Sequence, residues 1–180
     1  MAIILDTNCF SHVFSPKDSK HAEFRPVLEW VIKDKGFFVY GGSKYKKELG
    51  KCTKYLRFFR LLKEVGKVIE FDQEKIDNYQ NIVERKEHNP DFDDPHLPAR
   101  VVVSHCELIC SRDGRSIRFV TRKGLYPKRF VLPKYYKGLE NKSLLKETSI
   151  PNQLHQYKKK LRKKQVQRIM AIIDSVNSRK

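Results

Sequence analysis

Residues 2–8 read Ala-Ile-Ile-Leu-Asp-Thr-Asn, an apolar run that ends directly at the acidic residue Asp6. A short apolar run without alternating polar residues is typical of a strand that is buried on both faces of a parallel sheet. In parallel α/β sheets, ligand sites form beyond the carboxyl ends of the strands, which is where Asp6 would lie. The stretch therefore predicts the first strand of an α/β fold, with Asp6 beside a site.

The chain beyond this stretch alternates between apolar, β-prone runs and segments with apolar residues at helical spacing. Up to residue 114, we predict further strands at 37–40, 67–71 and 107–110. Between the strands we predict helices at 24–35, from Ser43 to Gly66, at 73–87 and from Asp94 onward. This alternation predicts an α/β domain with a mostly parallel sheet.

The pattern is weaker after residue 114. It predicts strands at 117–121 and 129–132, a helix at 135–147 and a final helix from Pro151 to about Asn177. The back half of the last helix has an apolar stripe made of Ile169, Met170, Ile172, Ile173 and Val176. This stripe packs either on the chain's own domain or on a partner, and an exposed stripe would favour self-association or inhibitor binding. We expect a domain at 1–135 and a basic, largely helical extension at 136–180.

The charge of the chain is concentrated in its last third. The 180 residues include 38 Lys and Arg and 21 Asp and Glu, a net charge of +17. Residues 121–180 hold 17 Lys and Arg against 3 acids, which leaves +14 there and only +3 in residues 1–120. This asymmetry predicts a polyanionic partner, RNA before an acidic protein or a membrane surface, and the alternative is a merely solvated tail. The residues that we expect to hold RNA are the densest basic run: Lys158, Lys159, Lys160, Arg162, Lys163 and Lys164.

Composition also indicates the compartment. No apolar run approaches the roughly 18–20 residues that a bilayer span needs, and the N-terminal stretch lacks the parts of a signal peptide. The four cysteines contain no Cys-x-x-Cys pair. We therefore expect a cytoplasmic protein with reduced thiols, in which Cys106 and Cys110 are core residues rather than zinc ligands.

Four acids fall at or near the ends of predicted strands. Asp6 follows the first strand, and Glu48 lies in the first turns of the helix after the second. Asp94 begins the helix that leads into the fourth strand, and Asp113 follows that strand. If strands one and four are neighbours, the four carboxylates converge at one edge of the sheet. Each acid alone has a structural alternative: a helix cap for Asp94, an Asp-Gly turn for Asp113 and a solvated helix position for Glu48.

Carboxylates that lie close together raise one another's pKa, and a divalent cation relieves this repulsion. An all-oxygen donor set suits Mg²⁺ or Mn²⁺ rather than zinc. The residues therefore predict a site for Mg²⁺ or Mn²⁺.

The same positions carry a family resemblance. The apolar strand that ends in Asp6-Thr7-Asn8 resembles the opening of the PIN-domain ribonucleases. Glu48 matches a Glu that this family places in the helix after its second strand. Residues 94–99 are similar to the family's Asp-x-x-Ile-x-Ala helix start, with Asp93 as a competing acid, and residues 108–113 to its apolar strand closing in Thr-x-Asp. The resemblance covers about residues 1–135.

This resemblance implies an α/β/α sandwich and a metal-dependent ribonuclease that prefers single-stranded RNA. Many bacterial members of the family are toxins that a cognate antitoxin holds inactive, so the resemblance also implies an antitoxin or inhibitor protein as a partner. The residues implied to bind or organise the metal are Asp6, Glu48, Asp94 and Asp113. Those implied to support the site are Thr7, Asn8 and Ser111.

We therefore expect a metal-dependent endoribonuclease. The main alternative is a non-catalytic nucleic-acid-binding or assembly module on the same fold. A metal-free ribonuclease that uses His12, His96 or His105 is a second alternative. A third is a phosphotransfer domain with Asp6 as nucleophile, which usually has an acid where this chain has Asn8.

Overall fold

The computed structural model describes residues 2–146 and 152–178 and contains one all-parallel sheet in this part of the chain. The strand order is β3-β2-β1-β4-β5, and β1 pairs with both β2 and β4. The strands are β1 (Ala2–Leu5), β2 (Phe37–Tyr40), β3 (Val68–Glu70), β4 (Leu108–Cys110) and β5 (Lys134–Tyr136). The predicted α/β class is confirmed, and the order is consistent with a PIN-like topology.

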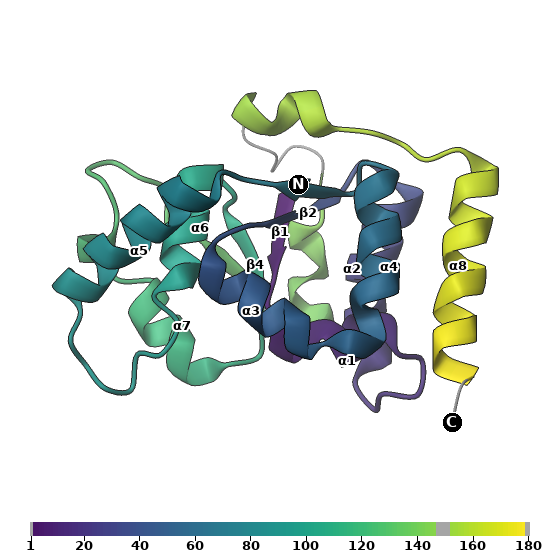
Figure 1. Ribbon diagram of the computed structural model, residues 1–180, viewed down its shortest axis with the longest axis horizontal. Coiled ribbons are helices and arrows are strands. Elements are labelled where there is room, and N and C mark those ends of the chain that lie inside the picture. The colour runs from purple at the N-terminus through teal and green to yellow at the C-terminus, as the bar shows by residue number, and fades with distance from the viewer. Residues whose placement is uncertain (1, 147–151, 179–180) are drawn as a thin grey trace.

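Helices cover both faces of the sheet, which makes three layers (Figure 1). One layer holds α1 (Phe10–Phe14), α2 (His21–Lys33) and α4 (Thr53–Glu64), with α8 (Lys163–Ser178) packed outside α4. The other layer holds α5 (Gln73–Lys86), α6 (His96–Ser104) and α7 (Gly114–Val120), and α3 (Ser43–Lys51) follows β2. Short 3-10 helices lie at Thr7–Cys9, Lys123–Leu125, Leu139–Leu144 and Asn152–Tyr157.

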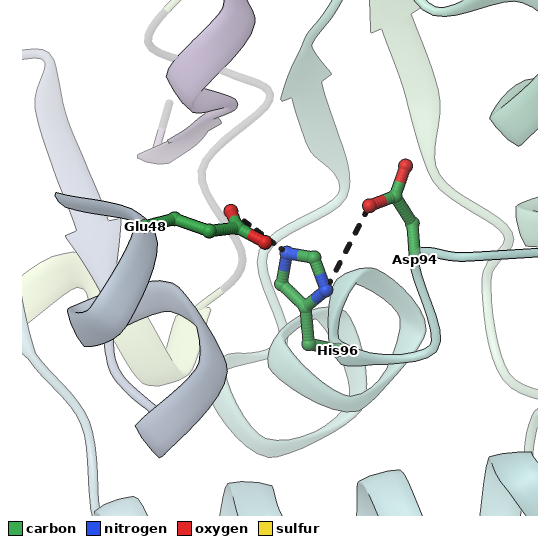
Figure 2. Close-up of side chains that lie close together, drawn as sticks. All are labelled: Glu48, Asp94 and His96. Carbon is green, nitrogen blue, oxygen red and sulfur yellow. Dashed lines mark ion pairs between the residues drawn. The ribbon is translucent and has the colours of Figure 1, made fainter. Parts of the chain in front are cut away.

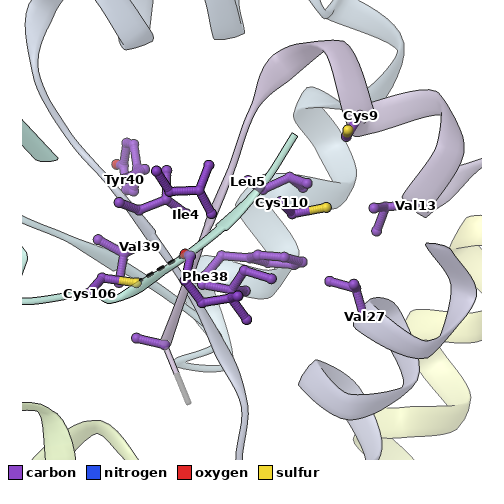
Figure 3. Close-up of a cluster of buried hydrophobic side chains, with 14 of the residues drawn as sticks. Ile4, Leu5, Cys9, Val13, Val27, Phe38, Val39, Tyr40, Cys106 and Cys110 are labelled. Carbon is purple, nitrogen blue, oxygen red and sulfur yellow. Dashed lines mark hydrogen bonds between the residues drawn. The ribbon is translucent and has the colours of Figure 1, made fainter. Parts of the chain in front are cut away.

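The core lies between these layers and includes all of β1 and β2 (Figure 3). The thiols of Cys9, Cys106 and Cys110 are free and buried in it, so the expectation that Cys106 and Cys110 are core residues is confirmed. Among the described helices, none is both long and apolar enough to cross a bilayer.

Several predictions after residue 114 are wrong. Residues 117–121, predicted as a strand, lie mostly in α7, because the side chain of Asp113 accepts hydrogen bonds from two main-chain N–H groups and starts a helix there. Residues 129–132 are not a strand, and the fifth strand begins at Lys134. The helix predicted at 135–147 is also wrong, since Tyr135 and Tyr136 pair with β4 in the sheet. Glu147 lies outside the described residues.

Three helix boundaries also differ from the predictions. The helix predicted from Ser43 to Gly66 is two helices, which meet at Cys52, where ψ is 46°. The helix predicted at 24–35 begins earlier, at His21, and ends at Lys33. In the C-terminal segment, a 3-10 helix precedes α8, which begins at Lys163, and the predicted start at Pro151 lies outside the described residues.

The C-terminal segment packs on the rest of the chain. Ile169 and Ile173 of α8 are buried, and α8 lies against α4, so the apolar stripe packs on the chain's own domain as far as its side chains are described. The Val176 side chain lies outside this part. Before α8, the segment is held by the buried Lys67, whose ammonium group donates to the carbonyl oxygens of Gly36 and Lys159.

Candidate active site

The first site residue, Asp6, is held where β1 and β4 end. Its N–H donates to the carbonyl oxygen of Cys110 at 3.0 Å, which continues the pairing of the two strands. Its Oδ2 atom accepts hydrogen bonds from Ser111 Oγ at 2.7 Å and from Asn8 Nδ2 at 2.9 Å. With its side chain buried and fixed by two donors, the Asp6 carboxylate has one orientation, and Asn8 and Ser111 are the residues that set it.

Glu48 reaches the same place from α3. Its Oε2 atom lies 3.4 Å from the hydroxyl of Thr7, which donates to it. The path of α3 depends on Gly41 and Gly42, which have φ values of 152° and 83°. A Cβ at Gly41 would lie only 2.7 Å from the carbonyl oxygen of Phe71, so this turn requires glycine and thereby aims α3 at the end of β1.

Burial raises the pKa of Glu48, and the charge of Asp6 adds to this effect, whereas Arg100 and Lys44 oppose it. The hydrogen bond from Thr7, the residue after Asp6, places Glu48 beside the end of β1, although 42 residues separate the two acids in the sequence.

Asp94 completes this group. It precedes α6, whose N-cap is Pro95, and its main-chain oxygen accepts a hydrogen bond from the N–H of Leu97 at 3.0 Å. Burial raises its pKa to about 6, with further contributions from the charges of Asp6 and Asp93. Asp93 itself is 63% exposed and faces Arg115 at 3.9 Å, so Asp94 is the acid of this pair that points into the site.

Asp113 has a structural role as well as a place beside the site. Its Oδ1 atom accepts a hydrogen bond from the N–H of Arg115 at 2.9 Å, which caps α7. Its own N–H donates to the hydroxyl of Ser111, which links it to Asp6. One oxygen each from Asp93, Asp94 and Asp113 lies within 4.8 Å of the others, so Asp113 borders the site although it also caps a helix.

Two further residues of the site come from α6, and sequence reasoning had not placed them there. From the sequence, His96 was a candidate only for the metal-free ribonuclease. Its ring is 1% exposed and lies between Glu48 and Asp94 (Figure 2), at 3.7 Å from Glu48 Oε2 and 3.9 Å from Asp94 Oδ1. Burial, reinforced by the charge of Arg100, holds the pKa of His96 well below its usual range, so the ring is neutral at neutral pH.

Arg100 lies one helical turn after His96 and is completely buried. Its guanidinium group stacks on the ring of Tyr45 at 4.0 Å, and none of its nitrogens has a hydrogen-bond partner among the residues that the structure describes. Its charge acts on Asp6, Glu48 and Asp94. Arg100 therefore supplies a fixed positive charge that partly offsets the three carboxylates. A signal was present in the sequence, since His96 and Arg100 fall on the same face of the helix as Leu97 and Val101.

His12 and His105, the other two histidines of the metal-free alternative, do not form an acid–base pair with His96. His12 is bound to Asp18 at 2.7 Å, and the ring of His105 stacks on Phe130. His96 and His105 are nine residues apart at opposite ends of α6, a separation of about 13 Å along the helix axis.

The donor set fits a divalent metal ion. One ligand atom from each of Glu48, Asp94 and His96 lies within 4.8 Å of the others, and Asp94 also belongs to the second group with Asp93 and Asp113. Carboxylate oxygens in a partly desolvated cluster are the ligands that Mg²⁺ and Mn²⁺ take in proteins. Asp6 belongs to neither group, and Glu48 and Asp113 belong to different ones, so three of the four predicted acids lie in two groups that share Asp94, and His96 adds a nitrogen to the predicted oxygen set.

The basic run that we expect to hold RNA lies at the other end of the sheet. Lys67 donates to the carbonyl oxygens of both Lys159 and Gly36. Lys67 comes directly before β3 and Gly36 directly before β2, whereas the acids follow the strands. Figure 1 shows the segment before α8 crossing the end of the sheet where β1 begins. Besides the buried Arg100, two further cations lie beside the acids: Lys44, which donates to the carbonyl oxygen of Asp93, and Arg115.

Comparisons with known proteins gave no match to this chain, whether with protein-family models, curated proteins or solved structures.

Proposed function

We propose that the chain is a metal-dependent endoribonuclease that hydrolyses phosphodiester bonds in single-stranded or structured RNA. The observation that supports this proposal is the convergence of Asp6, Glu48 and Asp94 beside buried Arg100, where parallel strands end. Carboxylates kept together in a partly buried site raise one another's pKa and so weaken the fold, which is the situation expected of a functional site. The family resemblance of the motifs points to the same chemistry.

Each residue has a definite task in this proposal. Asp6, Glu48, Asp94 and Asp113 would hold Mg²⁺ or Mn²⁺, which would polarise the phosphoryl group and activate a water molecule. Asn8 and Ser111 fix the direction of the Asp6 carboxylate, and Thr7 that of Glu48. Lys44 and Arg115 are placed to attract the phosphate backbone toward the acids. The run at 158–164 would then hold a more distant part of a long RNA.

The direct test is cleavage of a single-stranded RNA oligonucleotide by the full chain, with and without a chelator. We expect Asp6→Asn to lower the cleavage rate at least 100-fold while the protein stays folded, because charge stabilisation in such sites is typically worth about 10² to 10³ in rate. Glu84→Gln, which changes an exposed acid on α5, is the matched control and should cleave normally. Equal cleavage by wild type and Asp6→Asn would refute the proposal.

The same experiment decides the main alternative. A non-catalytic RNA-binding module would bind the oligonucleotide in a gel-shift assay and release it uncut at every metal concentration. Cleavage that survives chelation would instead point to the histidines.

A further inference from the structure

The ring of His96, like the guanidinium group of Arg100, is a buried polar group of the site that is unsatisfied among the described residues. The ring is 1% exposed, and neither Nδ1 nor Nε2 has a hydrogen-bond partner in residues 2–146 and 152–178. Burying a polar group without a partner costs free energy, and most such groups in native proteins bind something. On each side of the ring a carboxylate oxygen faces it, from Glu48 and from Asp94 (Figure 2).

The separations lie within the range of two ligands that share an ion. At 3.7 and 3.9 Å, the nitrogen–oxygen distances are too long for hydrogen bonds. Metal–ligand distances of about 2.1 Å place two ligands of one ion about 3 to 4 Å apart, depending on the angle between them. The ring nitrogens and the facing carboxylate oxygens are therefore close enough to bind one ion together.

We propose that His96 is a nitrogen ligand of the metal site, and that this ligand makes the site bind Mn²⁺ in preference to Mg²⁺. The inference rests on the proposed function for the role of the metal. One ring nitrogen binds the ion, which it shares with the carboxylate oxygen that faces that nitrogen. Mg²⁺ takes oxygen ligands, whereas imidazole suits transition metals, and Mn²⁺ accepts both donor types.

The sharpest test observes the ligand itself and needs no variant. Purified full-length protein, freed of metal by a chelator, is loaded with Mn²⁺ and examined by electron spin-echo envelope modulation. We expect modulation from a directly bonded ¹⁴N nucleus, and replacement of that signal by a ¹⁵N signal when only histidine is ¹⁵N-labelled. Bound Mn²⁺ without a directly bonded histidine nitrogen would overturn the inference.

Variants identify which of the six histidines is responsible. His96→Gln should remove the nitrogen signal and weaken Mn²⁺ binding about tenfold or more, measured by calorimetric titration, because loss even of a supporting contact to a metal ligand costs 10- to 100-fold. Mg²⁺ binding should change much less, since the Gln oxygen replaces the ring. His105→Asn changes an exposed histidine at the other end of α6 and should keep both the signal and the affinity. Unchanged Mn²⁺ affinity in folded His96→Gln would refute the assignment.

Failure of this inference differs from failure of the proposed function. If wild type cleaves RNA with Mg²⁺ and Mn²⁺ equally well and shows no nitrogen signal, only the role of His96 is refuted. If the folded protein binds Mn²⁺ through nitrogen but never cleaves RNA, the ligand assignment holds and the ribonuclease proposal fails. If the folded protein does not bind Mn²⁺ but cleaves RNA with Mg²⁺, only the role of His96 fails, and if it binds neither ion, both proposals fail.

Discussion

Asp94→Asn should make the metal-free protein more stable at neutral pH. In the native protein, burial and neighbouring charge raise the pKa of Asp94 from 3.8 to about 6. Between these two values the native state binds more protons than the unfolded state, so stability falls as the pH rises through this window and stays reduced above it. The pKa difference corresponds to about 3 kcal/mol, which we reduce to about 2 kcal/mol because solvent screens the 19% of the side chain that is exposed.

The amide of Asn has nearly the shape of the carboxyl group but no charge, so the variant avoids this loss. For a chain of this length, about 2 kcal/mol corresponds to a rise in Tm of about 4 to 8 °C at about pH 7.5. At about pH 4.5 the native carboxyl group is itself largely protonated, and the two proteins should melt within about 1 to 2 °C of each other. The measurement is differential scanning calorimetry of chelator-treated wild type and variant at both pH values.

Metal should reverse the order of the two proteins. At about 100 times its Kd, a bound ion stabilises the native state by about 2.7 kcal/mol, and Asp94→Asn should lose most of this gain because a ligand is removed. Glu84→Gln is again the control and should follow wild type at every condition. The reasoning from charge repulsion would be wrong if Asp94→Asn were less stable than metal-free wild type at neutral pH. It would also be wrong if the difference in Tm between variant and wild type were the same at both pH values.

Three further predictions concern the charges and hydrogen bonds around the acids. Arg100→Met removes the cation that lowers the pKa of Glu48, so the metal-free variant should lose stability more steeply than wild type as the pH rises from about 5 to 8. Arg100→Lys keeps the charge and should keep the wild-type slope. Parallel stability curves of Arg100→Met and wild type in thermal melts would contradict this. Ser111→Ala removes the hydrogen bond from the Ser111 hydroxyl to Asp6. Because a hydrogen bond to a charged group is worth about 1.5 to 3 kcal/mol, kcat should fall about tenfold to a hundredfold. Ser104→Ala, which changes another buried serine, is the control. The triple variant Lys158→Gln, Lys160→Gln and Lys164→Gln should weaken binding of long RNA and reduce the salt dependence of that binding. The cleavage rate of a saturating short oligonucleotide should stay unchanged, because these lysines lie at the far end of the sheet from the acids. An equal loss of cleavage with the short substrate would place the lysines at the site.

The local sequence pattern predicted the positions of the acids better than it predicted the secondary structure of the C-terminal third. Asp6, Glu48 and Asp94 could be placed because buried strands read as short apolar runs, and the carboxyl ends of parallel strands share one edge. Residues 117–121 could not be assigned in the same way, since an apolar run of that length suits a helix or a strand equally. The cap from Asp113 decides for the helix, and the pairing of Tyr135 and Tyr136 with β4 decides for the strand that follows.

The residues of α6 show a different limit. Helical spacing indicates that His96 and Arg100 share an inward face, but it does not indicate what lies opposite that face. What lies opposite is the set of acids, because α3 and α6 approach the end of β1 from different parts of the chain.

The amino-acid sequence by itself determined that strands alternate with helices, that four carboxylates lie at or near the ends of strands, and that positive charge is concentrated after residue 120. Only the tertiary structure decided that β1 lies between β2 and β4, which brings Glu48, Asp94 and Ser111 to Asp6, and that the basic run at 158–164 lies at the opposite end of the sheet. The physical reason is that periodicity and capping act within a few residues, whereas strand order and helix docking depend on burying apolar surface between segments that are far apart in the chain.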